Sequence, residues 1–264
     1  MRDYLNPDWQ GLLEQNGLAG FDALWDLKAE WFEEPNQRRG GWSGVARIEL
    51  KDADGQIHGL FLKRQENHCR RSLSHPLQGE PTFAAEMRNI LQTAEAGVPA
   101  LEPVYYGQRR VGGKWRAILM TVELSGFCPL HELLQQWQDD GWSSAIAERR
   151  QLITKAAVVI RQLHQHRLVH NSLHPKHLFV RSTENGEPEI HLIDLEKMRQ
   201  SLSFKQAARR DLDSFNRRAR NFGSRTDRLR FLKAYLGTPV LTQEGKALWH
   251  YLGGRYRREY PGAG

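Results

Sequence analysis

Apolar and polar residues alternate along the first half of the chain, and this alternation predicts a β-sheet. A period of about two is the spacing of a strand with one buried face. The predicted strands cover 24–32, 42–50, 57–65, 102–110 and 114–124. The Asp54-Gly55 pair between the second and third strands is a hairpin signal. These segments therefore predict an antiparallel sheet.

Helical periodicity interrupts this sheet once and then dominates from residue 129 onward. Segment 80–96 places Phe83, Met87 and Ile90 on one side, and Gly97 ends it. Later helices are predicted over 129–140, 146–167, 206–221, 225–236 and 242–252, with short strands over 177–181 and 189–195. One helix is thus inserted after the third strand, and helices form most of the second half.

This order of elements predicts an α+β protein with two lobes that share a cleft. The N-terminal β-rich lobe is expected over residues 1–123 and the C-terminal helical lobe over residues 124–264, with a short connector near 123–128. A chain of 264 residues is long enough for two such lobes.

Composition is that of a soluble globular protein, with 39% hydrophobic and 26% charged residues. The longest aliphatic run, 156–160, is far shorter than the roughly twenty residues of a membrane span. The N-terminus has no basic start followed by an apolar core, so no signal peptide is expected. With two cysteines, Cys69 and Cys128, a cytoplasmic protein is predicted.

The net charge of +7 is unevenly distributed. Residues 209–258 carry thirteen Lys and Arg against four Asp and Glu. These charges are either solvated helix faces or a surface for a polyanion such as a phosphorylated glycan or an anionic lipid. No nucleic-acid-binding motif accompanies them, so nucleic acid is not expected as a partner.

Five short segments carry residues typical of phosphoryl-transfer chemistry. They are "RRGGWSGVARI" (38–48), "LFLKRQ" (60–65), "FAAEMRN" (83–89), "HNSLHPKH" (170–177) and "IHLIDLEK" (190–197). In this order of elements they resemble the lipopolysaccharide kinase (Kdo/WaaP) family, in particular its InaA-like branch, which has a protein kinase-like fold. The resemblance extends from residue 24 to about residue 236.

In the β-rich lobe, the resemblance implies a nucleotide-binding set. Gly41 and Gly44 would let backbone N–H groups approach phosphates, although a plain hairpin turn explains them nearly as well. Lys63 matches the kinase lysine that binds the α- and β-phosphates, and Glu86 matches its ion-pair partner. The alternatives are an edge-strand lysine and a surface ion pair. Glu123, where the connector begins, completes the expected set.

In the helical lobe, the resemblance implies a magnesium site and a structural anchor. Asp194 stands at the D-F-G position, written D-L-E here, and would hold Mg²⁺. A turn cap is the alternative role for Asp194, and Glu196 is a second, weaker candidate for the metal. His177 falls where protein kinases place the metal-binding asparagine. Asp211 is the best match for the helix aspartate that anchors the catalytic loop from below, and Asp213 is the nearby alternative.

The kinase pattern H-R-D-L-x-x-x-N lies over "HNSLHPKH" without a gap, and it places Ser172 where the catalytic aspartate is expected. A serine does not accept a proton as a carboxylate does, and base catalysis is typically worth about 10²–10⁴ in rate. His174 and Lys176 are secondary candidates that could orient the acceptor hydroxyl or contact the γ-phosphate. His174 could also accept the proton of this hydroxyl.

A zinc site is the alternative interpretation of the same loop. His170, His174 and His177 are spaced so that they would share one face of a helix. Pro175 breaks such a helix, and no H-E-x-x-H glutamate is present. The kinase-loop interpretation accounts for the spacing without zinc and is preferred.

Three functions remain to be compared. The first is an ATP- and Mg²⁺-dependent kinase for a heptose or Kdo sugar of the lipopolysaccharide inner core, in peripheral contact with the inner membrane. The second is a pseudokinase, a nucleotide-binding or regulatory module without phosphotransfer because Ser172 replaces the aspartate. The third is a small-molecule kinase of the aminoglycoside-phosphotransferase type, which the basic C-terminal region argues against. The first is preferred.

Overall fold

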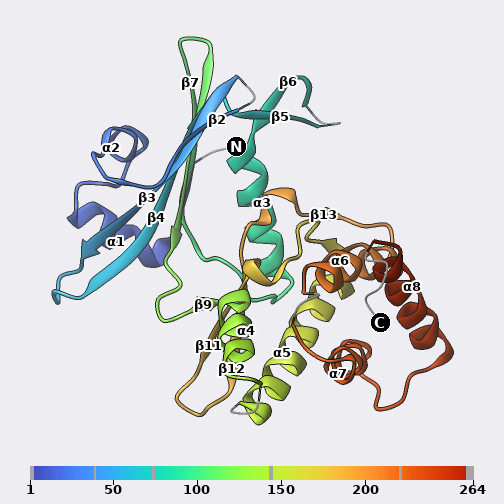
Figure 1. Ribbon diagram of the computed structural model, residues 1–264. Helices are drawn as coiled ribbons and strands as arrows, with labels where there is room; N and C mark the ends of the chain where they lie inside the picture. Colours follow the sequence, from blue (N-terminus) through green and yellow to red (C-terminus); the bar gives the residue numbers. More distant parts are fainter. Residues whose placement is uncertain (1–2, 39, 73–74, 143–144, 220–221, 260–264) are drawn as a thin grey trace. The chain divides into compact units, whose positions relative to one another are not determined.

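The computed structural model describes residues 3–38, 40–72, 75–142, 145–219 and 222–259 (Figure 1). The chain forms two compact units. One is β-rich and consists of Met1–Leu91 and Leu101–Ser125, and the other is helical and consists of Gln92–Ala100 and Gly126–Gly264.

The main sheet of the β-rich unit has the strand order β1-β7-β8-β4-β3-β2, with every neighbouring pair antiparallel. The strands of this unit are β1 (Tyr4–Leu5), β2 (Trp31–Arg38), β3 (Gly41–Lys51), β4 (Ile57–Glu66), β5 (Cys69–Ser72), β6 (His75–Pro81), β7 (Pro103–Val111) and β8 (Lys114–Val122). The helices are α1 (Pro7–Gln15), α2 (Phe21–Asp26) and α3 (Thr82–Glu95). The predicted antiparallel sheet with a helix after its third long strand is therefore confirmed.

One face of this sheet packs against α1 and α2, and the other faces α3 (Figure 1). Leu60 and Leu62 of β4 are fully buried in the core with Leu13 of α1 and Leu24 of α2. Because side chains alternate along a strand, Lys63 points to the opposite face, towards α3. The sheet thus separates an apolar core from the face that carries Lys63.

The strand predicted over 24–32 is wrong. Residues 21–26 form helix α2, with Phe21 and Leu24 buried at helical spacing, and the edge strand β2 begins only at Trp31. Most side chains of β2 are exposed, and Pro35 lies within it, as edge strands allow. An exposed edge strand has no buried face, so its sequence lacks the alternation that identifies a strand.

Two further elements of this unit were not predicted. Helix α1 begins at Pro7 behind an Asn6 N-cap, whose side chain accepts a hydrogen bond from the N–H of Asp8. The hairpin of β5 and β6 precedes α3, so the helix begins at Thr82 rather than at residue 80.

The helical unit is built around α5, whose buried side chains recur every three or four residues. These side chains are Leu152, Ala156, Ala157, Val159, Ile160, Leu163 and His164. Its helices are α4 (Leu130–Asp139), α5 (Ile146–Gln165), α6 (Phe204–Arg218), α7 (Arg225–Leu236) and α8 (Gln243–Glu259). Its strands are β9 (Cys128–Pro129), β10 (Leu168–Val169), β11 (Leu178–Ser182), β12 (Pro188–Leu192) and β13 (Arg199–Gln200), with 3₁₀ turns η1 (Pro175–His177) and η2 (Leu195–Lys197).

Short-range signals fix the ends of α7 at the predicted residues. Ser224 and Asp227 form a reciprocal capping box, and Gly237 ends the helix with a left-handed φ of 67°. The α+β class predicted from the order of elements is confirmed. Among the described residues, no helix is both long and apolar enough to cross a membrane.

Candidate active site

Lys63 and Glu86 form a largely buried ion pair in the β-rich unit. Lys63 Nζ lies 2.6 Å from Glu86 Oε1, and the two side chains are 17% and 5% exposed. Two largely buried charges are tolerated because each neutralises the other across a short hydrogen bond. The predicted ion pair is confirmed, whereas phosphate binding by Lys63 stays a prediction.

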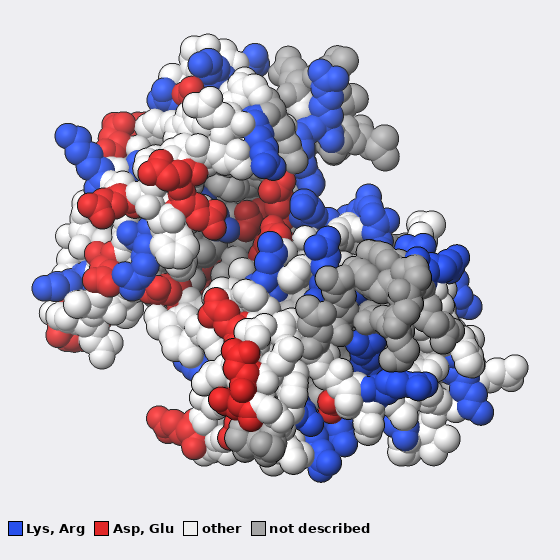
Figure 2. Space-filling model, in the orientation of Figure 1, with Lys and Arg blue, Asp and Glu red and all other residues white. Residues whose placement is uncertain are grey.

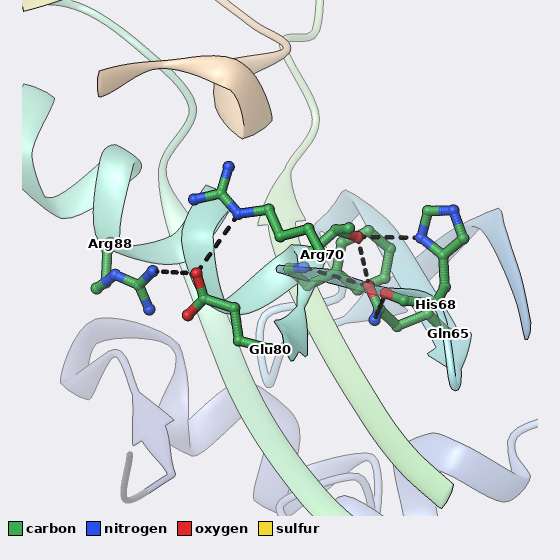
Figure 3. A network of polar contacts seen from close by, with 7 residues as sticks. Gln65, His68, Arg70, Glu80 and Arg88 are labelled. Carbon is green, nitrogen blue, oxygen red and sulfur yellow. Dashed lines mark hydrogen bonds and ion pairs between the residues drawn. The ribbon is translucent and has the colours of Figure 1, made fainter. Parts of the chain in front are cut away.

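Gln65, two residues after Lys63 on β4, ties the start of α3 to the same strand (Figure 3). Gln65 Oε1 accepts hydrogen bonds from the Thr82 hydroxyl at 2.8 Å and from the next backbone N–H at 3.2 Å. Gln65 Nε2 donates to the His68 carbonyl at 2.7 Å. Since Glu86 lies about one turn beyond Thr82, this buried network fixes the helix in the rotation that brings Glu86 to Lys63.

A second contact holds the β5–β6 hairpin against α3. Glu80 on β6 is 5% exposed and accepts from Arg88 of α3 at 2.7 Å and from Arg70 of β5 at 3.4 Å (Figure 3). Sequence inspection identified neither this contact nor Gln65, because both depend on the unpredicted hairpin.

Gly41 and Gly44 lie in β3 at positions that other side chains crowd. A Cβ on Gly41 would collide with the backbone of Glu66 and Asn67, and one on Gly44 would lie 2.8 Å from the Trp31 ring. Both glycines therefore have a packing role in the β2–β3 hairpin, and phosphate binding by their N–H groups stays a prediction. Arg39, within the same glycine-rich segment, lies outside the described residues.

The Glu123 carboxylate forms a bidentate ion pair with Arg47. Arg47 Nε and one terminal nitrogen of its guanidinium donate to the two carboxylate oxygens at 2.7 and 2.8 Å. Gly59 leaves the room for this side chain, since a Cβ there would collide with it. Nucleotide binding by Glu123 stays a prediction.

In the helical unit, the fully buried Asp211 of α6 holds the loop that follows β10. Asp211 Oδ2 accepts from the His170 N–H at 2.7 Å, and Oδ1 accepts from the Asn171 N–H at 2.9 Å. His164 Nε2 lies 3.1 Å from Oδ2. These bonds hold Asn171 in the left-handed region, at a φ of 62°. The predicted anchoring role of Asp211 is confirmed.

His170 connects this loop to the segment that carries Asp194. His170 Nε2 lies 2.9 Å from the Ile193 carbonyl oxygen, and burial lowers the pKa of His170. The neutral ring therefore donates from Nε2. Asp194 follows with a left-handed φ of 57°. The His170–Ile193 hydrogen bond therefore joins the loop directly to the D-L-E segment.

His177 and Asp194 lie together, as predicted. His177 Nδ1 lies 2.7 Å from the Ser172 carbonyl oxygen, and His177 Nε2 lies 3.3 Å from Asp194 Oδ2. Burial is the largest cause of a lowered His177 pKa. In the neutral ring, Nδ1 carries the proton and donates it to the Ser172 carbonyl oxygen. A lone pair on Nε2 therefore faces the Asp194 carboxylate.

His174 is arranged as a hydrogen-bond donor. Its Nδ1 accepts the Lys176 N–H at 3.1 Å, and burial is the largest cause that lowers the pKa of His174 to about 4. The neutral ring then carries its proton on Nε2, which donates and does not accept. The hypothesis that His174 accepts the substrate proton does not fit this tautomer. Ser172 is partly buried, and the Lys176 side chain is exposed.

The model of the lipopolysaccharide kinase (Kdo/WaaP) family matches residues 22–235. The chain belongs to this family. Its members are phosphotransferases, so the predicted family and enzyme class are confirmed. Protein InaA of Escherichia coli (strain K12) is 29% identical over 191 residues, which cover 72% of this chain and 84% of InaA.

Two solved structures of kinases share the fold. WaaP in complex with acyl carrier protein matches with a TM-score of 0.71 and 23% identity, over 98% of this chain and 100% of WaaP. Ethanolamine kinase from Plasmodium vivax matches with a TM-score of 0.51 and 12% identity, over 80% of this chain and 70% of the enzyme.

Asp194 and His177 of this family member offer two ligand atoms that would suit a Mg²⁺ ion. The substrate phosphates would supply further ligands. Mg²⁺ is usually bound by one or two carboxylates with water and substrate phosphates. Asp194 supplies a partly exposed carboxylate, and His177 supplies an adjacent lone pair. Among the described residues, no group of three or more His, Cys, Asp or Glu side chains is placed to hold a metal.

Proposed function

We propose that this chain is an ATP- and Mg²⁺-dependent kinase that phosphorylates a heptose or Kdo sugar of the lipopolysaccharide inner core. The observation that carries the proposal is the buried Lys63–Glu86 ion pair in a member of this family. A buried lysine whose partner is fixed by a second network is preorganised to bind phosphate.

Each unit contributes one part of the nucleotide chemistry. Lys63 would bind the α- and β-phosphates, with Glu86 fixing its position. Asp194 and His177 would hold Mg²⁺, which supplies charge neutralisation for the phosphate oxygens when bound. Gly41 and the other glycines of the β2–β3 hairpin would allow the backbone to approach these oxygens.

In the transfer step, the acceptor hydroxyl oxygen forms a bond to the γ-phosphorus while the bond from that phosphorus to the ADP oxygen breaks. Ser172 has no basic atom for the hydroxyl proton, and His174 presents a donor. The proton therefore passes to water or to an oxygen of the transferred phosphoryl group. His174 Nε2–H and the Lys176 ammonium would stabilise charge on the phosphoryl oxygens. Positioning and electrostatics then supply most of the catalysis.

A pseudokinase is the second candidate, and Ser172 at the base position favours it. The two functions share nucleotide binding and differ in phosphate transfer. The kinase would act at the cytoplasmic side of the inner membrane, where ATP is present, and would contact the membrane peripherally through its lipid-linked substrate.

The test combines a binding titration with a transfer assay. ATP is titrated calorimetrically with and without Mg²⁺ into the wild type, Lys63→Met, Asp194→Asn and Lys114→Met. Lys114 is the matched control, since it is also a lysine paired with a glutamate. Its side chain is 60% exposed, however, and its Nζ lies as far as 3.5 Å from Glu66 Oε1. Loss of a charge-assisted hydrogen bond of about 1.5–3 kcal/mol predicts ATP binding roughly 10- to 100-fold weaker in Lys63→Met, and no change in Lys114→Met.

Transfer is measured from γ-labelled ATP to purified core oligosaccharide. Labelled oligosaccharide supports the kinase. Nucleotide binding without transfer to any core sugar supports the pseudokinase, and a wild type that binds no nucleotide contradicts both.

An acyl carrier protein is a proposed partner, because the similar WaaP was solved in complex with one. The helical unit contains a cavity of about 600 Å³ whose lining is mostly apolar and rich in aromatic residues, with several charged side chains among them. Its aromatic residues are Trp137, Trp142, Phe215, Phe222, Phe231 and Trp249. Such a cavity suits an acyl chain. A carrier protein with a long acyl group should raise the melting temperature, whereas the unacylated carrier should not.

A further inference from the structure

A basic hollow lies between α6 and α8 of the helical unit. Its volume is about 710 Å³, within the range of about 300–1,000 Å³ that ligand pockets occupy. Five basic side chains and one acidic side chain line it, namely Lys205, Arg209, Arg210, Arg217, Arg255 and Asp213. Figure 2 shows Lys and Arg gathered over α6, α7 and α8 on the face in view.

Asp213 organises part of this charge. The side chain is 8% exposed, and its Oδ2 lies 3.2 Å from Arg255 and 3.3 Å from Arg217. Among the lining residues, this single carboxylate stands against five basic side chains. Arg209 lies over the Tyr251 ring at 5.1 Å, which joins α6 to α8 a second time. The hollow is therefore built by contacts between the two helices.

The remaining lining suits a sugar that carries several negative charges. Lys205 and Arg210 are exposed and add two further cations. Hydroxyl and amide groups of Ser203, Gln206 and Ser214 lie among the charges, where sugar hydroxyls would find partners. Planar guanidinium groups bind carboxylate and phosphate with two parallel hydrogen bonds. A concave site of this kind fits a compact oligoanion better than the flat surface of a bilayer.

The hollow also adjoins the candidate active loop within the same unit. Asn171 lines it and directly precedes Ser172 in the chain. Arg210 is next to Asp211, which accepts the Asn171 N–H at 2.9 Å. A ligand bound on α6 would therefore lie beside the loop that receives the acceptor hydroxyl.

We propose that the hollow between α6 and α8 is the acceptor subsite, which binds the carboxylate or phosphate groups of an oligoanionic core sugar. The proposal rests on the kinase function proposed above and adds the location and charge chemistry of substrate recognition. Binding is expected to weaken with salt, because much of it comes from charge.

The experiment measures binding of deacylated lipopolysaccharide core oligosaccharide to the full chain by calorimetry at two salt concentrations. The test variant is Lys205→Gln/Arg210→Gln. The matched control is Arg150→Gln/Lys155→Gln, which removes the same charge from exposed positions on α5. We expect the test variant to bind at least 10-fold more weakly and the control to bind within about 2-fold of wild type. ATP affinity should be unchanged in both variants, and Arg210→Lys should retain more binding than Arg210→Gln.

The outcomes separate this inference from the proposed kinase function. Equal weakening in test and control variants would mean that only net charge matters, and it would overturn the subsite while leaving the kinase function intact. Binding to phosphatidylglycerol vesicles that the test variant loses and the control keeps, without binding of the oligosaccharide, would assign the hollow to the membrane. That result would also overturn the proposal. Oligosaccharide binding that only the test variant loses, without phosphate transfer by the wild type, would support the hollow as the binding site and contradict the kinase function.

Discussion

Replacing Asp211 by alanine should destabilise the helical unit more than any surface charge change. The carboxylate accepts hydrogen bonds from the His170 and Asn171 N–H groups and contacts His164 Nε2, all in a fully buried position. Alanine leaves these donors without an acceptor, at about 1–3 kcal/mol each. Such costs are not additive, and removing one partner of a buried charged network typically costs about 3–5 kcal/mol.

Asp213→Ala is the control, since Asp213 lies two residues further on α6 and is also buried. Its partners Arg217 and Arg255 are 24% and 46% exposed and can be hydrated when the carboxylate is removed. We therefore expect a loss of only about 1 kcal/mol. Asp211→Asn keeps one acceptor oxygen and should lie between the two alanine variants.

The assay is urea unfolding monitored by far-UV circular dichroism, together with hydrogen exchange of individual amides. In the wild type, the His170 and Asn171 amide hydrogens should exchange slowly, and in Asp211→Ala they should lose protection first. If Asp211→Ala and Asp213→Ala differ by less than about 0.5 kcal/mol and the two amides stay protected, the proposed anchor is refuted.

Three further predictions concern the reaction. Ser172→Asp should raise phosphate transfer by at least 10-fold, because a positioned base is typically worth about 10²–10⁴; a lower rate at unchanged ATP affinity would contradict this account of the loop. His174→Gln, which keeps a side-chain donor, should retain most of the activity, whereas His174→Ala should lose about 10-fold; equal losses would show that donation from Nε2 is unimportant. Gln65→Met should weaken ATP binding by about 10-fold by letting α3 rotate Glu86 away from Lys63. Loss of stability in Gln65→Met at unchanged ATP affinity would show that Gln65 has only a structural role.

The Lys63–Glu86 pair could be predicted because the resemblance marks both residues and two local periodicities agree with it. Alternation along β4 sends Leu62 into the core and Lys63 to the other face, and α3 presents Glu86 there. The resemblance also pointed to Asp211 or the nearby Asp213 in the helix after the D-L-E segment, and the structure places Asp211 against the loop. Both assignments needed the resemblance together with the order of elements.

Other features depend on contacts that no local pattern encodes. Strand β2 exists through its pairing with β3, and its exposed side chains hide it from any hydrophobic pattern. Glu123 is neutralised by Arg47, which precedes it by 76 positions in the chain. Gln65 gains its role only because Thr82 returns to it after the unpredicted hairpin. In each case the partner comes from another strand or helix.

The loop around Ser172 shows why the missing carboxylate does not by itself indicate a dead site. Its backbone is held by Asp211, and its carbonyl fixes the tautomer of His177. These bonds fix the backbone of the loop in one conformation, whether or not Ser172 can act as a base. A base contributes about 10²–10⁴ in rate, whereas positioning and charge stabilisation supply most of phosphoryl transfer. If the chain is the kinase proposed above, it would lack the smaller contribution and retain the larger one, so slow transfer is the expected behaviour of the wild type.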